Sequence, residues 1–285
     1  VIADPYAEHA RLRDAGPVVW LERWNVYACA RYYDVRTVLA DHDNFVSSAG
    51  TGLDNFNHVA PMRPKSLLIE ADPPAHTHAR GVVARVLSPQ TLTALREPFA
   101  AEADALVDRL INRSPQRQPV IDGVRDLAQA YALKVFPDAV GIETEGRESL
   151  LRYSDLLFNA FGPRNALFER AAFGIELIAE WVLAQCKRGA SSSGGLGAKV
   201  YAAVDAGELS ADEALLLVRS FLSAGLDTAI SGLGYALLLL AQHPMQYERL
   251  HADPTLARRV FDEALRIETP AQIIARTTAR DVEIA

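Results

Sequence analysis

The sequence has little cysteine: Cys29 and Cys186 are far apart and form no Cys-x-x-Cys motif. Disulfide scaffolds and zinc sites need paired or clustered ligands, so neither is expected, and a reducing compartment fits this usage. Basic residues are also fewer than acidic ones: the chain has 29 Lys and Arg and 36 Asp and Glu, which gives a formal net charge of −7. Nucleic acid is therefore excluded as a main partner, since phosphate binding requires a basic surface.

Several sorting and binding signals are missing as well. No N-terminal segment has the basic-then-apolar form of a signal peptide, and the most apolar stretch, residues 228–242, is shorter than a membrane span. No internal repeat and no glycine-rich phosphate loop after a strand is found. With 285 residues and 49% hydrophobic content, the chain suits a soluble, cytoplasmic globular protein with a sizeable core.

The residue pattern predicts a mainly α protein with small β-sheets, organised as a single domain over residues 1–285. Helices are expected at residues 4–15, 33–40, 74–86, from 89 onward, 124–135, 150–161, 165–186, 210–242 and 254–266. A hairpin is expected from residues 18–21 and 26–30, and short β-prone pieces around 269–278 and 281–285. Because the chain starts at Val1 and stops inside a strand-like run, we expect it to be truncated at both ends.

Two connecting segments differ in character. Residues 45–66 are rich in Gly, Asn, Ser and Pro and show no period, which is typical of a binding loop. Residues 191–195 are expected to form a flexible linker.

The long helix, residues 210–242, breaks local rules in its middle. A glycine there costs about 1 kcal/mol against alanine, and a buried carboxylate without a partner costs more. The residues that share or border one face by helical spacing are Ser220, Ser223, Ala224, Asp227 and Thr228, and Gly225 lies within the same turn. Small residues let a flat ligand approach the backbone. The alternative is a polar face that touches a neighbouring helix.

Two charged pairs lie one helical turn apart. Glu263 and Arg266 can form an ion pair at i, i+3. His76 and Arg80 follow Asp72-Pro73-Pro74 and can face one anionic ligand, whereas metal ligation by His76 lacks a second ligand at suitable spacing. Taken singly, both pairs are by default solvated surface features.

These motifs occur in an order and spacing that resemble the bacterial cytochrome P-450 haem-thiolate monooxygenases. The matching stretches are Asp72-Pro73-Pro74-Ala75-His76-Thr77-x-x-Arg80, Ala224-Gly225-Leu226-Asp227-Thr228, Glu263-Ala264-Leu265-Arg266 and Arg276. The resemblance covers essentially the whole chain and implies a cytochrome P-450 fold, incomplete at the C-terminus, with haem b as the cofactor of the full-length protein.

The resemblance also implies roles for these residues. Asp227 and Thr228 look like the acid–alcohol pair that delivers protons during oxygen activation. Ala224 and Gly225 look like the groove against the haem face, and His76, Arg80 and Arg276 look like the cations that hold the haem propionates. Glu263 and Arg266 look like a buried structural pair. The chain departs from the common pattern at Ala229, where many members have a second threonine.

A narrower resemblance is to P-450 enzymes that oxidise para-substituted benzoates, typically by O-demethylating 4-methoxybenzoate. It rests on Asn25-Val26-Tyr27, Arg63-Pro64-Lys65-Ser66-Leu67, Phe158-Asn159-Ala160-Phe161-Gly162-Pro163 and Leu217-Val218-Arg219-Ser220. An aromatic carboxylate needs a cation and hydroxyl donors at one end and apolar walls around its ring. The expected substrate contacts are Arg63, Ser66, Arg219, Ser220 and Ser223 at the carboxylate, and Ile69, Phe158, Phe161, Ala224, Ala271 and Ile274 around the ring.

Alternatives remain for this narrower interpretation. Phe158 and Phe161 can be ordinary core residues, and Arg63 can be a solvated loop cation. Ile274-Ala275 stands where the benzoate-oxidising enzymes have two phenylalanines, so a wider slot for an aromatic or cinnamate-like carboxylate is expected.

The haem-thiolate ligand is the missing part. Neither Cys29 nor Cys186 lies in the glycine- and phenylalanine-rich loop that supplies it, so the ligand is expected beyond Ala285. The resemblance implies a monooxygenase that uses O2 and receives electrons from a 2Fe–2S ferredoxin and its NADH-dependent reductase. The alternatives are a P-450 of another substrate class and a non-catalytic helical anion-binding protein without iron ligation.

Overall fold

The computed structural model describes residues 4–113 and 120–284 and divides into two compact units. Unit 1 comprises Val1–Ala79, Ala160–Arg164 and Ile274–Ala285, and unit 2 comprises Arg80–Asn159 and Asn165–Ile273. Each unit is therefore assembled from segments that are far apart in sequence. The single domain expected over residues 1–285 stays a prediction.

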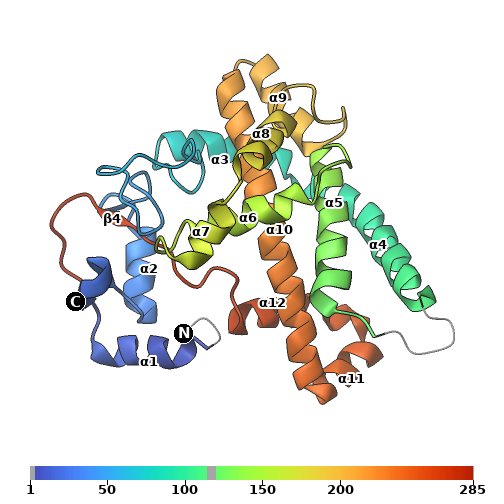
Figure 1. Cartoon of the computed structure of the whole chain (residues 1–285), viewed down its shortest axis with the longest axis horizontal. Helices are drawn as coiled ribbons and strands as arrows, with labels where there is room; N and C mark the ends of the chain where they lie inside the picture. The colour runs from blue at the N-terminus through green and yellow to red at the C-terminus, as the bar shows by residue number, and fades with distance from the viewer. Residues whose placement is uncertain (1–3, 114–119, 285) are drawn as a thin grey trace. The chain divides into compact units, whose positions relative to one another are not determined.

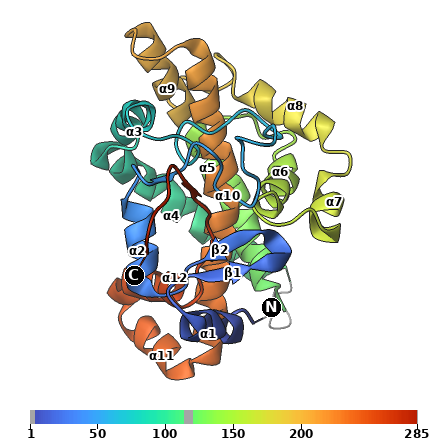
Figure 2. The ribbon, with the colours of Figure 1, turned by 90° about the vertical axis from the view of Figure 1, so that its left-hand side faces the viewer.

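In the part of the chain that the structure describes, unit 1 contains the small sheets, two complete α-helices and one 3-10 turn. Its elements are α1 (Tyr6–Ala15), β1 (Val19–Leu21), η1 (Glu22–Trp24), β2 (Val26–Ala28), α2 (Tyr32–Ala40), β3 (Phe45–Val46) and β4 (Thr277–Thr278). Strands β1 and β2 form the predicted antiparallel hairpin, with Trp20 opposite Tyr27 (Figure 2). The turn closes at Asn25, whose positive φ of 53° suits an asparagine.

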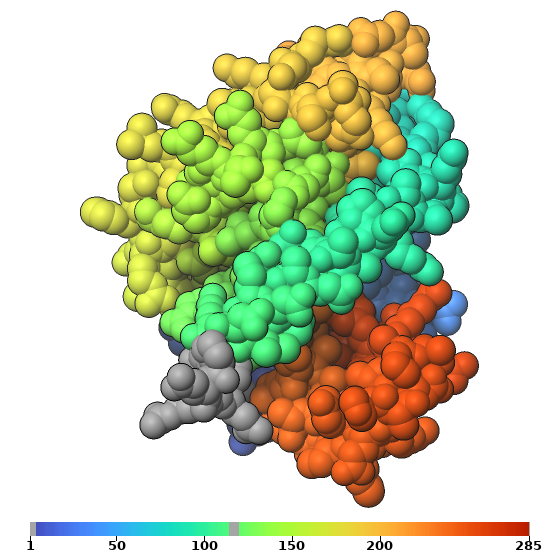
Figure 3. Space-filling view, turned by 90° about the vertical axis from the view of Figure 1, so that its right-hand side faces the viewer, coloured from blue at the N-terminus to red at the C-terminus, as the bar shows by residue number. Residues whose placement is uncertain are grey.

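Unit 2 is helical. Its elements are α3 (Ala75–Val86, which begins in unit 1), α4 (Pro89–Asn112), the π-helix η2 (Gly123–Gln129), α5 (Ala130–Val140), α6 (Ser149–Asn159), α7 (Ala166–Ala172), α8 (Glu176–Gln185), α9 (Leu196–Asp205), α10 (Ala211–Gln242), α11 (Pro244–Ala252), η3 (Pro254–Leu256) and α12 (Ala257–Ile267). Helix α4 begins as predicted, with Ser88 accepting a hydrogen bond from the Thr91 amide. Figure 3 shows α4 crossing one face of this unit.

Helix α10 is the centre of unit 2. It packs against α5, α6, α9, α12 and η2, and Figure 1 shows α5 running beside it. Ser210 and Glu213 form a capping box at its start, and Leu217, Leu222 and Leu226 are fully buried along it. Among the described helices, α10 alone is long and apolar enough to cross a membrane, but core helices pass the same test. Its buried residues run from Ala214 to Gly232, the part against which the neighbouring helices pack.

The helix predicted over residues 165–186 is wrong as a single element. It is broken between α7 and α8 at Gly174, which adopts a left-handed φ of 64°. The apolar residues on both sides continue one periodic pattern, which hides the break, while the glycine makes the turn possible.

Three further expectations need correction. Residues 191–195 are a packed turn rather than a linker, because the Ser192 amide donates to the Gly141 carbonyl at 2.8 Å and Gly195 abuts Val140. Two helices were missed: α9, although it buries Leu196, Val200 and Tyr201, and α11, which buries no residue and shows no apolar stripe. Of the β-prone C-terminal pieces, only Thr277–Thr278 pairs, with β3; residues 281–284 form no strand, and Ala285 lies outside the described residues.

Candidate functional site

The middle of α10 carries hydroxyls that bond within their own helix. The Thr228 Oγ1 hydroxyl donates to the Ala224 carbonyl at 2.8 Å, and the Ser220 hydroxyl donates to the Leu216 carbonyl at 2.9 Å. Ser223 likewise donates to the Ser220 carbonyl at 3.2 Å. Each of these bonds fixes the direction of the hydroxyl hydrogen and leaves lone pairs on the oxygen able to accept a proton donor.

Asp227 is a half-buried acid beside Thr228. Burial raises the pKa of Asp227 above its ordinary value, and the negative charge of Asp155 on α6 raises it further. A carboxyl with a raised pKa holds its proton closer to neutral pH, as a general acid requires. The local sequence therefore produces an acid–alcohol pair, with the acid tuned by its surroundings.

Gly225 has a packing role that the sequence did not reveal. A Cβ at this position would lie 2.1 Å from Cζ of Phe136, so the ring on α5 occupies the space of the missing side chain. Ala224, one residue earlier, is exposed. The groove predicted at Ala224 and Gly225 thus has one side filled by an aromatic ring, and cofactor contact by either residue stays a prediction.

The three cations expected to hold an anionic group have different environments. Within the described residues, the side chains of His76 and Arg80 form no hydrogen bond or ion pair, and Arg80 is exposed. Arg276 is half-buried and donates from Nη1 to the Ala275 carbonyl at 2.8 Å. Burial lowers the pKa of Arg276, while Asp72 opposes that shift.

Asp72 organises the surroundings of Arg276. Its carboxylate accepts the Ser47 and Ser48 amides at 2.8 and 3.0 Å. Burial acts to raise the pKa of Asp72, but the hydrogen bond from the Ser48 side chain, the two amides and Arg276 outweigh it and lower the pKa. Arg276 is thus a half-buried guanidinium with a carboxylate nearby, and its contact with a haem propionate stays a prediction, as do those of His76 and Arg80.

Arg63, the predicted anchor for a substrate carboxylate, is already engaged. It forms a two-pronged ion pair with Glu70, with Nη1–Oε2 at 2.8 Å and Nη2–Oε1 at 3.0 Å. Glu70 is 5% exposed and also accepts the Ser66 amide at 2.7 Å. Arg63 is thus neither a solvated cation nor an uncommitted one, because the buried carboxylate seven residues later takes both of its terminal nitrogens.

Comparison with known proteins decides the family. Residues 196–285 match the cytochrome P-450 family profile. Over 283 residues the chain is 52% identical to cytochrome P-450 CYP199A2 of Rhodopseudomonas palustris, which covers 99% of this chain and 68% of that protein. The chain belongs to the cytochrome P-450 family. The P-450 resemblance predicted from the motifs is confirmed, and with it an enzyme of the haem-dependent monooxygenase class.

Solved P-450 structures agree with this fold. CYP109Q5 from Chondromyces apiculatus superimposes with a TM-score of 0.76 at 30% identity, covering 99% of this chain and 69% of that one. Myxobacterial CYP267B1, solved with myristic acid, gives a TM-score of 0.79 at 27% identity, covering 99% and 72%. Family membership makes haem the cofactor and favours an enzyme over the non-catalytic binding interpretation.

The P-450 motif pair Glu263 and Arg266 forms, but it is not buried. Arg266 donates from Nε and Nη2 to the two carboxylate oxygens, each at 2.7 Å, and the two side chains are 69% and 55% exposed, Arg266 and Glu263 respectively. The expectation of a buried pair is therefore wrong for the described residues. The apolar side of α12 faces α10, where Phe261 and Leu265 pack on Gly232, and the charged side is left to solvent.

The predicted aromatic clamp is not on one helix face. Phe158 lies in α6, which ends at Asn159, and Phe161 follows in a turn. The carbonyl of Phe161 accepts the Leu53 amide at 3.0 Å. The prediction assumed that one helix carries both rings, but α6 ends two residues before Phe161. The two rings therefore belong to separate segments, and their contact with a substrate stays a prediction.

The other predicted substrate contacts differ in exposure. Ile69 and Ile274 are 46% and 47% exposed, and Ala271 is exposed as well. Ser66 is buried, and its Oγ accepts the Leu68 and Ile69 amides at 3.2 and 3.3 Å. Arg219 is only 2% exposed, directly beside Ser220 on α10.

Neither cysteine of the described chain is suited to ligate haem iron. Cys186 is fully buried, and burial raises its pKa to about 12, although Arg219 opposes the shift. Burial and Asp34 raise the pKa of Cys29. Both are thiols at neutral pH, whereas the ligand must be a thiolate.

Three partners of the predicted residues were missed. Glu70, Asp155 and Phe136 act on Arg63, Asp227 and Gly225 from 7, 72 and 89 positions away. Glu70 had a weak signal, as an acid inside an otherwise apolar turn. The other two had none, because contacts between separate helices leave no local pattern.

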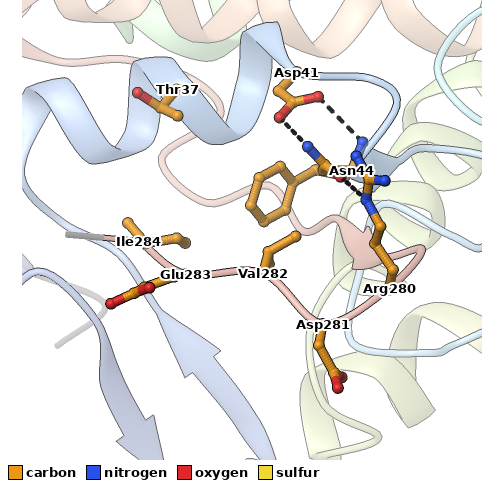
Figure 4. A pocket seen from close by; sticks show the side chains of 9 residues that line it. Thr37, Asp41, Asn44, Arg280, Asp281, Val282, Glu283 and Ile284 are labelled. Atoms are coloured by element: carbon orange, nitrogen blue, oxygen red, sulfur yellow. Dashed lines mark hydrogen bonds between the residues drawn. The ribbon is translucent and has the colours of Figure 1, made fainter.

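A cavity of about 410 Å3 in unit 1 contains none of the predicted site residues. Figure 4 shows Arg280 reaching Asn44, whose amide nitrogen donates to Asp41 at 2.6 Å. The hydrogen bond from Asn44 lowers the pKa of Asp41, with a smaller contribution from Arg280. The polar groups here mainly satisfy one another.

Proposed function

We propose that this P-450 inserts one atom of O2 into para-substituted aromatic carboxylic acids, by O-demethylation or hydroxylation, with 4-methoxybenzoate as the reference substrate. The observation that carries the acid class is Arg219, a cation buried to 2% exposure beside the Ser220 hydroxyl, about two turns before Thr228 on the same helix. A buried guanidinium favours an anionic group, and the Ser220 hydroxyl, which donates to the Leu216 carbonyl, would have to rotate to join it.

The oxygen-activating residues of the proposal are Asp227 and Thr228. When bound, haem supplies the activation of O2. Burial raises the pKa of Asp227, which favours a proton on its carboxyl, and the half-buried side chain can exchange that proton with solvent. The Thr228 hydroxyl hydrogen is directed at the Ala224 carbonyl, so the lone pairs of the Thr228 oxygen can accept the proton donor and hold it in position. His76, Arg80 and Arg276 would hold the haem propionates.

Recognition of the substrate carboxylate is assigned to Ser66, Arg219, Ser220 and Ser223, with Arg63 in a modified role. Because Glu70 neutralises Arg63, a substrate carboxylate would have to share that guanidinium. Apolar walls are assigned to Ile69, Phe158, Phe161, Ala271 and Ile274. Electrons are assigned to a 2Fe–2S ferredoxin with an NADH-dependent reductase, and the cytoplasm is the proposed location.

The test compares an acid with its neutral isostere. Titrating the haem-loaded protein with 4-methoxybenzoate should shift the ferric spin state, and 4-methoxybenzamide should bind at least about 30-fold more weakly, because a charge pair contributes roughly 2–5 kcal/mol. Arg219→Gln should abolish most of that preference. Equal affinity for acid and amide would refute the acid class.

The pair of Arg63 with Glu70 favours one second candidate, a P-450 for neutral aromatic substrates. In that case the buried pair is purely structural and Glu70→Gln should not change acid binding. On the acid hypothesis Glu70→Gln removes a competing carboxylate, so 4-methoxybenzoate should bind more tightly.

A further inference from the structure

Helix α10 has a gap on its core-facing side, and an aromatic ring from α5 fills it. Gly225 follows the fully buried Val218 by seven residues, so both lie on the same side of the helix. A Cβ on Gly225 would lie 2.1 Å from Cζ of Phe136 and 2.5 Å from both Cε1 and Cε2. Because the two ring edges are equally distant, the tip of the ring points straight at the glycine. The ring therefore occupies the place of the side chain that α10 lacks.

The ring stands on a part of α5 that is tied down. Arg147 is 6% exposed, and its guanidinium donates to the carbonyls of Ile142 at 2.5 Å, Glu143 at 2.7 Å and Lys134 at 3.4 Å. Lys134 lies two residues before Phe136, so the ring belongs to the turn that Arg147 holds. In a close-packed interior, a ring fixed in this way transmits the position of α5 to the helix that it touches.

The contact falls in the turn of α10 that carries the acid–alcohol pair. Asp227 follows Gly225 by two residues, about 200° around a helix of 3.6 residues per turn, so it projects from the side opposite to the ring. Thr228 donates its hydroxyl to the Ala224 carbonyl at 2.8 Å across the same turn. Such a bond from a side chain to its own helix favours bending. Phe136 therefore limits how far a turn that bends easily can move toward α5.

We propose that Phe136 is a positioning residue for oxygen activation, because its ring sets the distance of the Ala224–Thr228 turn from α5 and so holds Asp227 and Thr228 in place. The proposal rests on the roles proposed above for Asp227 and Thr228. Misplacing a reacting group by about 1 Å can cost on the order of 100-fold in rate. A small movement of this turn is therefore enough to impair proton delivery.

The chain contains a matched control on the same side of the same helix. Gly232 lies seven residues beyond Gly225, and a Cβ there would lie 3.0 Å from Cζ of Phe261 on α12. Both rings are half-buried, and both point at a glycine of α10. Gly232 lies outside the turn that carries the acid–alcohol pair. Phe261→Ala therefore removes an equivalent packing contact without releasing that turn.

The first measurement needs neither substrate nor proton transfer. The infrared C–O stretch of carbon monoxide on the reduced, haem-loaded full-length protein responds to the groups that surround the ligand. Phe136→Ala should shift this band. Phe136→Leu keeps most of the bulk and should remain close to the parent, and Phe261→Ala should leave the band unchanged.

A compensating pair covers the case in which Phe136→Ala does not fold. Gly225→Ala pushes the turn away from the ring and should shift the C–O band as well. Adding Phe136→Leu to Gly225→Ala makes room for the methyl group and should return the band toward the parent. A band that the second change leaves displaced would contradict a direct contact between the two positions.

The second measurement follows the fate of dioxygen. An O2 molecule that takes up two electrons and two protons without oxygen insertion leaves as hydrogen peroxide. With a ferredoxin that reduces the parent, Phe136→Ala should raise the peroxide formed per O2 consumed about three- to ten-fold, part of the roughly 100-fold or more that a well-placed proton donor contributes. Asp227→Asn should raise it too, whereas Phe261→Ala should match the parent.

The outcomes separate the proposal from the function on which it rests. Equal band shifts or equal peroxide fractions in Phe136→Ala and Phe261→Ala would overturn the positioning role and leave Phe136 as ordinary packing. A parent-like peroxide fraction in Asp227→Asn would refute the role proposed for that acid. In that event the infrared band still decides whether Phe136 positions the turn.

Discussion

Asp155 on α6 and Asp227 on α10 interact electrostatically, and the negative charge of Asp155 adds to burial in raising the pKa of Asp227. The two helices pack against each other, so the pair arises from tertiary structure. It gives the acid–alcohol motif of α10 a proton affinity that the motif itself does not specify. Two carboxylates close together favour protonation of the more buried one.

This pair predicts a pH-dependent change in stability. The folded-state pKa of Asp227 is raised above 3.8, so its contribution is fully favourable below that pH and is lost as pH rises through the folded pKa. Asp227→Asn should match the parent near pH 4 and become progressively more stable than the parent toward pH 7. Urea denaturation across this range measures the difference, and Asp155→Asn should show part of it.

Asp138 provides a control of opposite sign. Burial acts to raise its pKa, but bonds from Lys134 and Arg147 outweigh burial and lower it. Asp138→Asn should therefore cost most stability at neutral pH and less as the pH falls. If Asp227→Asn behaved like Asp138→Asn, the raised pKa of Asp227 would be wrong.

A second prediction concerns Gly225 and Phe136. Gly225→Ala places a carbon 2.1 Å from the Phe136 ring, so we expect a loss of about 1–3 kcal/mol in unfolding free energy, the usual cost of overpacking. Phe136→Leu should partly rescue it. Gly234→Ala in the same helix meets nothing closer than 3.6 Å and should stabilise by up to about 1 kcal/mol. Equal effects at the two glycines would contradict the packing role.

A third prediction concerns the Arg63–Glu70 pair. Among the residues that the structure describes, Arg63→Ala leaves a carboxylate of 5% exposure with the Ser66 amide as its one hydrogen-bond donor. Breaking such a pair costs about 3–5 kcal/mol when fully buried. Because the Arg63 side chain is 23% exposed, we expect about 2–3 kcal/mol in chemical denaturation. The exposed pair of Arg188 with Asp205 is the control, and Arg188→Ala should cost under about 1 kcal/mol.

A fourth prediction concerns the two thiols. Cys186 is fully buried with a pKa of about 12, so a disulfide reagent at pH 8 should modify it only when the protein unfolds. Cys29 is half-buried and should react first, more slowly than a free cysteine. Labelling in native and denaturing buffer, followed by peptide mapping, measures both rates. Fast labelling of Cys186 in the native protein would contradict its burial.

The sequence predicted elements best where the signal was local. Ser210 and Glu213 cap the start of α10, and Ser88-Pro89 marks the start of α4. Such starts are predictable because caps depend on neighbouring residues. The buried helix α9 was missed, and so were the break at Gly174 and the exposed helix α11. A continuing apolar pattern masks the break, and α11 has no apolar stripe to detect.

The same division holds for the site. By itself, the sequence determined the family, the acid–alcohol motif and the charged pairs one turn apart, because each is written in order and spacing along one segment. Only the tertiary structure decided that Glu70 occupies Arg63, that Phe136 fills the space beside Gly225, that Arg266 and Glu263 stay exposed, and that Asp155 tunes Asp227. The physical reason is that burial and pairing between separate segments set charge and space, and neither is encoded at any one position.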